Sequence, residues 1–180
     1  MDTIVCPGLN WAVHDRRFEQ LVRAHHRAVH TYARSIANDP SVVDDAVQET
    51  FIKAWRHLDS FRGDGNFEGW LIRICRNCVI DIERREARAR SAVDRQLRLL
   101  PPPTATTMDD TSEVTQLIDS LPRSHREVLT VCGVLGYDYE TAAQILEIPV
   151  GTVRSRLHRA RQALEQLLEP GSNSQDERAS

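Results

Sequence analysis

Four arginines lie between residues 148 and 164, and no acidic residue lies among them. Val153, Leu157, Ala160 and Leu164 recur at helical spacing, which predicts a helix with one apolar stripe. The polar residues of this segment include Thr152, Arg154, Ser155, Arg156, His158, Arg159 and Arg161. A helix of this kind can contact the phosphates and base edges of DNA. The alternative is a solvated basic helix packed on a neighbouring element.

A second short helix is predicted just upstream, over residues 139–146, with Asp138 as its N-cap. The connection over residues 147–149 is a turn, because Pro149 disfavours helix in the residue before it and suits the first turn of the next helix. Two short helices joined by a tight turn, the second with a basic outer face, predict a helix-turn-helix. Its second helix would enter the major groove of DNA.

Residues 35–52 contain four acidic residues and no lysine or arginine. A helix is predicted from about residue 42 to 58, and it has two stripes on different faces. Val43, Val47, Phe51, Ala54 and Leu58 form the stripe expected to face the core, and Asp45, Gln48, Glu49 and Ile52 form the second. Early acids favour the positive end of a helix, so their role could be local. An acidic stripe that includes an isoleucine also suits a protein partner with basic side chains.

A loop over residues 61–67 is bracketed by aromatic residues and precedes a helix that runs into the upper 80s. The helix buries Leu71, Ile74, Cys75, Cys78 and Ile82, and its outer side chains include Arg73, Arg76, Asn77 and Arg84. The loop could hold an unstacked base, and the helix could bind single-stranded or duplex DNA. A simple connection and a solvated charged face are the alternatives.

Cysteine and histidine pairs raise the possibility of metal or redox chemistry. Cys75 and Cys78 form a CxxC pattern, but both lie on the apolar stripe, where free cysteine packs as a small hydrophobe, and there is no second CxxC. His26 and His30 have zinc-ligand spacing with no evident third ligand. We therefore expect buried thiols and surface histidines, with no metal and no cofactor. Thiol or zinc sensing remains an alternative.

The composition is that of a soluble globular protein of 180 residues, with a formal net charge of −3 and 41% hydrophobic residues. No apolar run approaches the ~20 residues of a membrane helix, so no membrane insertion is expected. The first residues lack the basic leader and apolar core of a secretory signal, which predicts a cytoplasmic protein. The four cysteines do not suggest a disulfide framework.

No useful β-alternation is present, so the expected fold is all-α, with two small helical domains joined by a flexible linker and the second domain ending in the helix-turn-helix. The linker contains three consecutive prolines, which cannot sit inside a helix. The expected organisation is a flexible arm at 1–14, a first domain at 15–90, the linker at 91–112, a second domain at 113–169 and a disordered tail at 170–180.

Several blocks of the chain together resemble the extracytoplasmic-function (group IV) sigma factors of the sigma-70 family. In order, these blocks are residues 44–51 (DDAVQETF), 61–64 (FRGD), 70–77 (WLIRICRN), 121–128 (LPRSHREV) and 149–156 (PVGTVRSR). The resemblance covers roughly residues 15–168, that is, both domains. It departs from the family at positions 75 and 78, where this chain has cysteine and the family often has a small aliphatic residue.

The resemblance implies a bacterial transcription initiation factor whose first domain is sigma region 2 and whose second is sigma region 4. Asp45, Gln48, Glu49 and Ile52 would bind the β′ clamp helices of core RNA polymerase, and region 4 would meet the β flap. The first domain would read and melt the −10 promoter element with Phe61, Arg62, Gly63, Asp64, Asn66, Phe67, Arg73, Arg76, Asn77 and Arg84.

The helix-turn-helix would read the −35 element. Arg154, Ser155, His158 and Arg159 would face base edges, and Thr152, Arg156 and Arg161 would lie nearer phosphate. The chain would carry no catalytic residues, because the polymerase performs the chemistry, and an anti-sigma factor is an expected partner. Two other functions stay open on the residues alone. They are a stand-alone helix-turn-helix regulator and a thiol- or zinc-responsive interaction protein.

Overall fold

The structure, a computed structural model, describes residues 11–61, 66–96 and 117–168. In these ranges it contains helices and turns and no β-strand, which confirms the all-α prediction. The elements are α1 (Trp11–Ile36), η1 (Pro40–Val42), α2 (Val43–Arg56), η2 (Leu58–Ser60), α3 (Phe67–Gln96), α5 (Arg123–Leu129), η3 (Thr130–Val134), α6 (Tyr139–Leu146) and α7 (Val150–Leu168).

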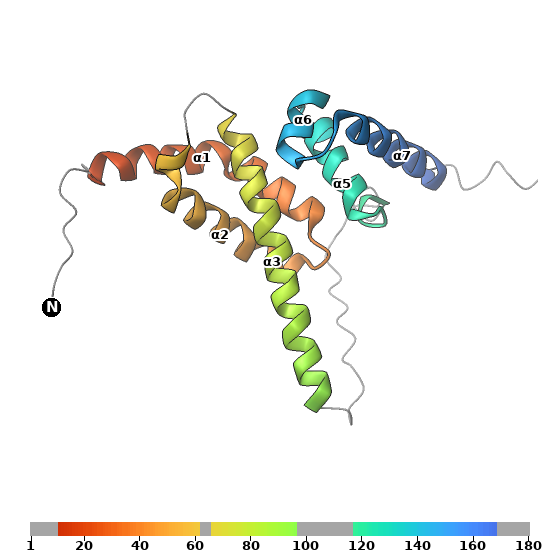
Figure 1. The fold of residues 1–180 in the computed structure, drawn as a ribbon, viewed down its shortest axis with the longest axis horizontal. Coiled ribbons are helices and arrows are strands. Elements are labelled where there is room, and N and C mark those ends of the chain that lie inside the picture. Colours follow the sequence, from red (N-terminus) through yellow and green to blue (C-terminus); the bar gives the residue numbers. More distant parts are fainter. Residues whose placement is uncertain (1–10, 62–65, 97–116, 169–180) are drawn as a thin grey trace, which may run out of the picture.

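Helices α1, α2 and α3 form the N-terminal domain (Figure 1). α2 returns alongside α1, and α3 crosses them, with its C-terminal part extending away from the other helices. The apolar stripe predicted for α2 is buried at Val43, Val47, Phe51 and Ala54. It packs against α1 and α3, where Tyr32 and Leu71 are fully buried. Burial of one face of each helix leaves the opposite faces of α2 and α3 for other contacts.

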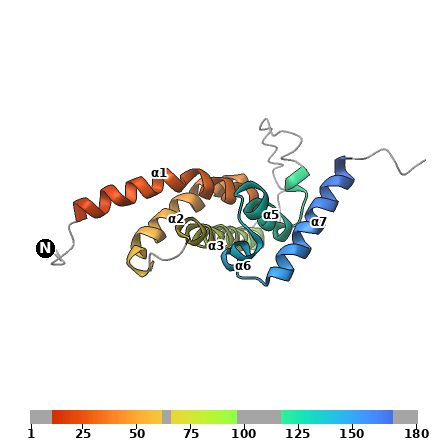
Figure 2. The same cartoon turned by 90° about the horizontal axis from the view of Figure 1, so that it is seen from above.

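The C-terminal domain contains α5, η3, α6 and α7 (Figure 2). Its core includes Val128, Val153, Leu157 and Ala160. The apolar stripe predicted for the basic helix is thus buried at three of its four residues, and Leu164 is half-buried. The short helix at 139–146 is also confirmed. Its N-cap is Asp138, whose carboxylate accepts a hydrogen bond of 2.8 Å from the backbone N–H of Thr141.

The turn between α6 and α7 depends on one residue in the left-handed region. Glu147 caps the C-terminus of α6 with φ 56° and ψ 43°, and its N–H donates to the carbonyl of Ala143. Glycine or asparagine is the usual residue there, so a glutamate is a strained choice. α7 begins immediately after Pro149. The turn predicted at residues 147–149 therefore separates two helices as expected.

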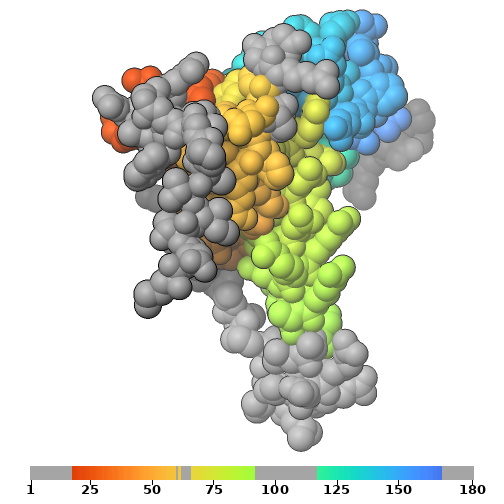
Figure 3. Space-filling model, turned by 60° about the vertical axis from the view of Figure 1, so that its left-hand side comes forward, coloured from red at the N-terminus to blue at the C-terminus, as the bar shows by residue number. Residues whose placement is uncertain are grey.

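The two domains pack directly against each other. α5 and η3 contact α1, and α6 contacts α3. Figure 3 shows the C-terminal domain lying against α3. Ile145 of α6 lies over Gly69 of α3, and a Cβ at Gly69 would be 2.8 Å from Ile145 Cγ1. The absence of a side chain at Gly69 thus allows the close approach of α6. The two domains predicted from sequence are docked in this structure.

Two helices run past the boundaries predicted from sequence. α1 begins at Trp11, inside the segment 1–14 predicted as a flexible arm. α3 ends at Gln96, inside the segment 91–112 predicted as linker. The prolines at 101–103 stop a helix only where they stand, and nothing in residues 91–96 breaks it earlier. Residues 97–112 of the predicted linker, residues 1–10 of the predicted arm and the predicted tail at 170–180 lie outside the described residues.

Candidate nucleic-acid and protein interfaces

The basic helix α7 presents its polar residues outward. Arg154, Ser155, His158, Arg159 and Arg161 are exposed, whereas Thr152 and Arg156 are half-buried beside the core stripe. Arg154 is held on the protein side by Glu140 at 3.8 Å and by the ring of Tyr139, whose centroid is 5.9 Å from the guanidinium carbon. The exposed residues form a continuous polar strip along the helix.

The arginines of α7 affect the pKa of a neighbouring histidine. Burial, together with the positive charges of Arg159 and Arg156, lowers the pKa of His125 on α5. Two guanidinium groups close to this imidazole make the local potential positive. That potential suits a polyanion, so the prediction that α7 carries a DNA-binding surface remains consistent with the geometry.

A groove of about 600 Å³ lies between α2 and α3. Three of the residues predicted to bind DNA, Arg76, Asn77 and Arg84, line it together. Its other walls are formed by Lys53, His57, Trp70, Ile74, Ile80 and Asp81. Sequence reasoning missed Lys53 and His57 as parts of this surface because they come from α2, and only the packing of α2 on α3 brings them beside Arg76.

The aromatic residues that bracket the predicted base-binding loop contact one another. The ring centroids of Phe61 and Phe67 are 5.1 Å apart, and each lies 5.4 Å from that of Trp70. Asn66 has a local role, since its side-chain oxygen accepts from the N–H of Gly69 at 3.0 Å and caps α3. Arg62, Gly63 and Asp64 lie outside the described residues.

The four residues predicted to bind a protein partner line one groove on the outer face of α2. This groove measures about 440 Å³ and is bounded on the α3 side by Ile82, Arg85 and Glu86. Asp45 and Gln48 are exposed, and Ile52 is 43% exposed. The predicted stripe is therefore a single outward surface.

Glu49 differs from its neighbours on this surface because it is already paired. It accepts a hydrogen bond of 2.8 Å from Arg85, and Lys53 Nζ lies 3.0 Å away. Although partial burial opposes the effect, hydrogen bonds from Lys53 and Arg85 lower the pKa of Glu49. The charge of Glu49 is thus partly neutralised, which leaves Asp45, Gln48 and Ile52 as the freer contact residues.

A second, mostly apolar groove lies on the other side of Gln48 and Ile52, between α1 and α2. It measures about 650 Å³ and is lined by Phe18, His26, Asp44, Val47, Gln48, Phe51, Ile52, Trp55 and Arg56. The rings of Phe18 and Trp55 pack edge to face, with centroids 4.8 Å apart. Sequence reasoning did not assign Phe18 or Trp55 to a surface, because Phe18 comes from α1 and Trp55 from α2 and only the packing of these helices brings the two rings together.

Cys75 and Cys78 are fully buried in the N-terminal core, as expected for packing residues. Burial raises the pKa of Cys75 to about 12 and also raises that of Cys78. Among the residues that the structure describes, no three His, Cys, Asp or Glu side chains are grouped to hold a metal ion. The thiol- or zinc-responsive alternative has no support in this geometry. Within the same described residues, no helix is long and apolar enough to cross a bilayer.

Comparison with known protein families gives two matches in order along the chain. The Sigma-70 region 2 family matches residues 21–89, and the Sigma-70 region 4 family matches residues 111–164. These matches cover the N-terminal and C-terminal domains described above.

Curated relatives carry the same family assignment. The ECF RNA polymerase sigma factor SigE of Mycolicibacterium smegmatis is 34% identical over 158 residues, which is 84% of this chain and 61% of that protein. The RNA polymerase sigma-H factor of Pseudomonas aeruginosa is 35% identical over 169 residues, 86% of this chain and 88% of the relative. The ECF RNA polymerase sigma-E factor of Escherichia coli K12 is 34% identical over 164 residues, 83% and 85% of the two chains.

Two solved structures resemble the fold across both domains. The sigma factor RpoE in complex with the anti-sigma factor NepR, from Bartonella quintana, has a TM-score of 0.69 and 28% identity, covering 87% of this chain and 99% of that one. CnrH in complex with the cytosolic domain of CnrY has a TM-score of 0.65 and 34% identity, covering 88% and 91%.

Proposed function

This chain belongs to the extracytoplasmic-function group of the sigma-70 family, the RNA polymerase sigma factors, and on this basis we propose which partner each of its surfaces binds during transcription initiation. The outer face of α2 binds core polymerase, the α2–α3 groove binds the −10 element and α7 reads the −35 element. The observation that carries the proposal is α7. Its residues Val153, Leu157 and Ala160 are buried, Arg154, Arg159 and Arg161 are exposed, and no acidic residue lies between residues 150 and 164.

Polymerase binding is assigned to Asp45, Gln48 and Ile52, with Glu49 at the edge. Acidic and amide side chains around an exposed isoleucine complement a basic partner helix with an apolar centre. We assign the β′ clamp helices as that partner, and the β flap as the partner of region 4. The chain then contributes no catalytic group and no cofactor, and it acts in the cytoplasm, where the polymerase is.

Binding and melting of the −10 element is assigned to the groove that contains Arg76, Asn77 and Arg84. Trp70 and His57 offer rings on which unpaired bases can stack, worth about 1–3 kcal/mol per base. Extruding a base from the duplex costs a few kcal/mol, so such stacking would offset much of the cost of melting. Phe61 and Phe67 support this groove through Trp70. Arg62, Gly63 and Asp64 complete the proposed base-binding loop.

Reading of the −35 element is assigned to the exposed strip of α7. Arg154, Ser155, His158 and Arg159 face base edges in the major groove, while Thr152, Arg156 and Arg161 contact phosphate. A bidentate arginine–guanine contact contributes about 1–3 kcal/mol of discrimination. Replacing Arg159 with alanine is therefore expected to reduce transcription selectively, according to the −35 sequence.

An anti-sigma factor is the proposed inhibitory partner. One structural neighbour, the sigma factor RpoE, is in complex with the anti-sigma factor NepR, and its match covers 87% of this chain. The apolar groove beside Phe18 and Trp55 is continuous with the polymerase-binding surface through Gln48 and Ile52. An inhibitor bound there would compete with polymerase.

The test is run-off transcription with sigma-free core polymerase on fragmented genomic DNA of the source bacterium. The proposed function requires promoter-specific RNA that depends on this chain, and no transcript from any template would refute it. Tight, specific binding to duplex DNA without polymerase would favour a stand-alone regulator instead. In the same assay, the Arg159 variant distinguishes a base contact from a phosphate contact. A loss of transcription that is uniform at all promoters would mean that Arg159 contacts phosphate.

A further inference from the structure

Arg85 of α3 lies in the wall of the groove to which polymerase binding is assigned above. Its Nη2 donates a hydrogen bond of 2.8 Å to Oε2 of Glu49 on α2, and its Nε donates at 3.3 Å to the backbone carbonyl of Asp81. Glu49 belongs to the stripe predicted to bind a protein partner. A cation of the same chain therefore already occupies the carboxylate that a basic partner would approach.

The two members of this ion pair differ in how firmly the fold holds them. The side chain of Glu49 is 29% exposed, and Lys53 lies 3.0 Å from its other oxygen, Oε1. The side chain of Arg85 is 60% exposed. The carboxylate is thus fixed between α2 and α3, whereas the guanidinium can leave it without moving a core residue. Exposed ion pairs of this kind are weak, so a competing cation can displace Arg85.

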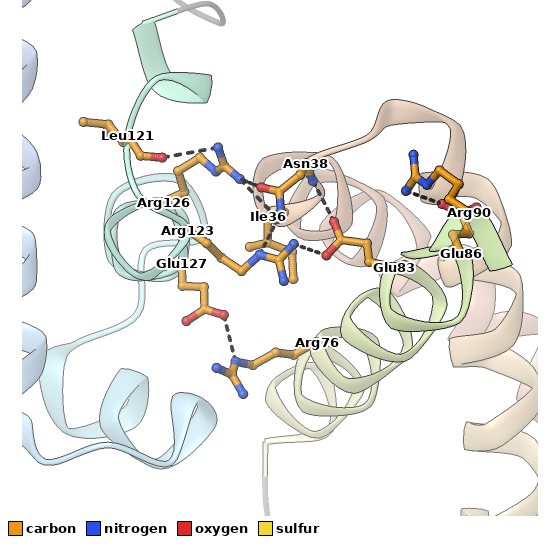
Figure 4. Close-up of polar contacts among 10 residues, drawn as sticks. All are labelled: Ile36, Asn38, Arg76, Glu83, Glu86, Arg90, Leu121, Arg123, Arg126 and Glu127. Carbon is orange, nitrogen blue, oxygen red and sulfur yellow. Dashed lines mark hydrogen bonds and ion pairs between the residues drawn. The ribbon is translucent and has the colours of Figure 1, made fainter. Parts of the chain in front are cut away.

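A second ion pair on the same groove repeats the arrangement. Glu86 also lines the groove, and Arg90, one turn further along α3, lies 3.6 Å from its carboxylate (Figure 4). Arg90 is exposed as well. Of the three carboxylates that line this groove, those of Glu49 and Glu86 therefore each carry an exposed arginine of α3.

These arginines work against a basic partner in two ways. A cation that approaches Glu49 must replace Arg85, so that one ion pair is exchanged for another and little is gained. If Arg85 stays, two like charges lie side by side, which is unfavourable across an interface. The measured coupling within exposed ion pairs corresponds to a factor of about 1.4 to 5 in an equilibrium constant. The arginines should thus lower the affinity of the groove by a similar factor.

We propose that Arg85, with a smaller contribution from Arg90, competes with basic residues of core polymerase for the carboxylates of this groove and so limits the affinity of the chain for polymerase. The proposal rests on the assignment of polymerase binding to the outer face of α2. On binding, a polymerase cation takes the place of Arg85 at Oε2 of Glu49, while Lys53 stays at Oε1. Arg85 is then a positioning residue, which acts on the partner through Glu49.

The test is a titration of the full chain, labelled at its N-terminus, with sigma-free core polymerase, followed by fluorescence anisotropy at about 100 mM salt. We expect Arg85→Gln to bind about two- to fivefold more tightly than wild type. The gain should disappear at about 0.5 M salt, where the Debye length is only about 4 Å. Arg85→Lys keeps the positive charge and should show no gain.

A matched control separates the local effect from that of net charge. Arg23→Gln breaks an exposed ion pair with Glu19 on α1, 2.6 Å long and outside the groove. Like Arg85→Gln, it changes the formal net charge of the chain from −3 to −4. It should bind polymerase as wild type does. Adding Arg90→Gln to Arg85→Gln should tighten binding further, because Glu86 then also loses its counter-ion.

A double-mutant cycle shows whether Arg85 acts through Glu49. In a Glu49→Gln background, where no carboxylate remains to compete for, Arg85→Gln should give no gain. The proposal is overturned if Arg85→Gln binds polymerase no more tightly than wild type. It is also overturned if Arg23→Gln gives an equal gain, or if the gain persists in the Glu49→Gln background.

The same titration tells the two levels of the argument apart. A wild-type chain that does not bind core polymerase at all would refute the proposed function together with this inference. A wild-type chain that binds, alongside an Arg85→Gln variant of equal affinity and unchanged circular dichroism, would refute only the competition by Arg85.

Discussion

Gly69 offers a test of domain docking that changes no charge. A Cβ at this position would lie 2.8 Å from Cγ1 and 3.0 Å from Cδ1 of Ile145, both below ordinary contact distance. Ile145 is 4% exposed and β-branched, so it has little freedom to move aside. The substitution Gly69→Ala should therefore push α6 away from α3.

The magnitude follows from two opposing effects. Overpacking a tight contact costs about 1–3 kcal/mol, and that cost falls on the docked state because Ile145 belongs to the other domain. Alanine is a better helix former than glycine by up to about 1 kcal/mol, which stabilises α3 in both states. Since about 1.4 kcal/mol corresponds to a tenfold change, the ratio of docked to open molecules should fall by about 5- to 150-fold.

Scattering and circular dichroism together provide the assay. We expect a larger radius of gyration with unchanged helical content. Gly133→Ala is the matched control, because a Cβ there would lie 3.8 Å from Leu129 Cδ1, an ordinary contact within one domain. Identical scattering profiles for Gly69→Ala and wild type would refute the reasoning, since they would mean that the docked state tolerates the extra methyl group.

Three further predictions concern stability and thiol chemistry. Arg126→Met should lower the free energy of unfolding by about 2–5 kcal/mol in a denaturant titration, because a side chain that is 4% exposed is lost and buried acceptors lose their donor. Asp39→Ala should cost about 0.5–2 kcal/mol at pH 7, since its carboxylate caps η1 through hydrogen bonds from Ser41. Those hydrogen bonds lower the pKa of Asp39 in the folded protein. Their contribution to stability is therefore complete above the pKa of about 3.9 in the unfolded chain and is lost as the pH falls through the lower pKa of the folded protein. Cys75 and Cys78 should resist a disulfide-exchange reagent at pH 8 in the native protein, because burial raises the pKa of both thiols and that of Cys75 to about 12. In guanidinium, where the chain is unfolded, all four cysteines should react.

Each of these expectations has a contrary outcome. Unfolding of Arg126→Met within about 0.5 kcal/mol of wild type would show that water replaces the lost donor. A stability difference for Asp39→Ala that persists at pH 2 would mean that the ionised carboxylate is not its source. Rapid modification of Cys75 or Cys78 in the native protein would show that the core opens, and it would support the redox alternative.

The sequence alone was sufficient to predict the helices and any surface that is formed by a single helix. Asp45, Gln48, Glu49 and Ile52 recur at three- and four-residue steps on α2, and helical geometry places them on one face without help from the rest of the chain. Asp138 was predictable as a cap for the same reason, because its hydrogen bond to Thr141 spans only three residues. The buried stripe of α2 likewise follows from local periodicity. In α3 the prediction was right for Leu71, Cys75, Cys78 and Ile82, but Ile74 is half-buried and the buried Ile72 and Val79 were missed.

Only the tertiary structure could show what the arginines of α3 contact. Arg76 meets Glu127 across 51 residues, and Arg73 meets Gln144 across 71. Lys53 and His57 join the groove of Arg76 only because α2 packs on α3. A charged side chain on an outer helix face has the same sequence pattern whether it meets water, DNA or another domain. Its partner depends on how whole helices pack against one another. Helix packing depends in turn on contacts between residues far apart in the sequence, which local periodicity does not reveal.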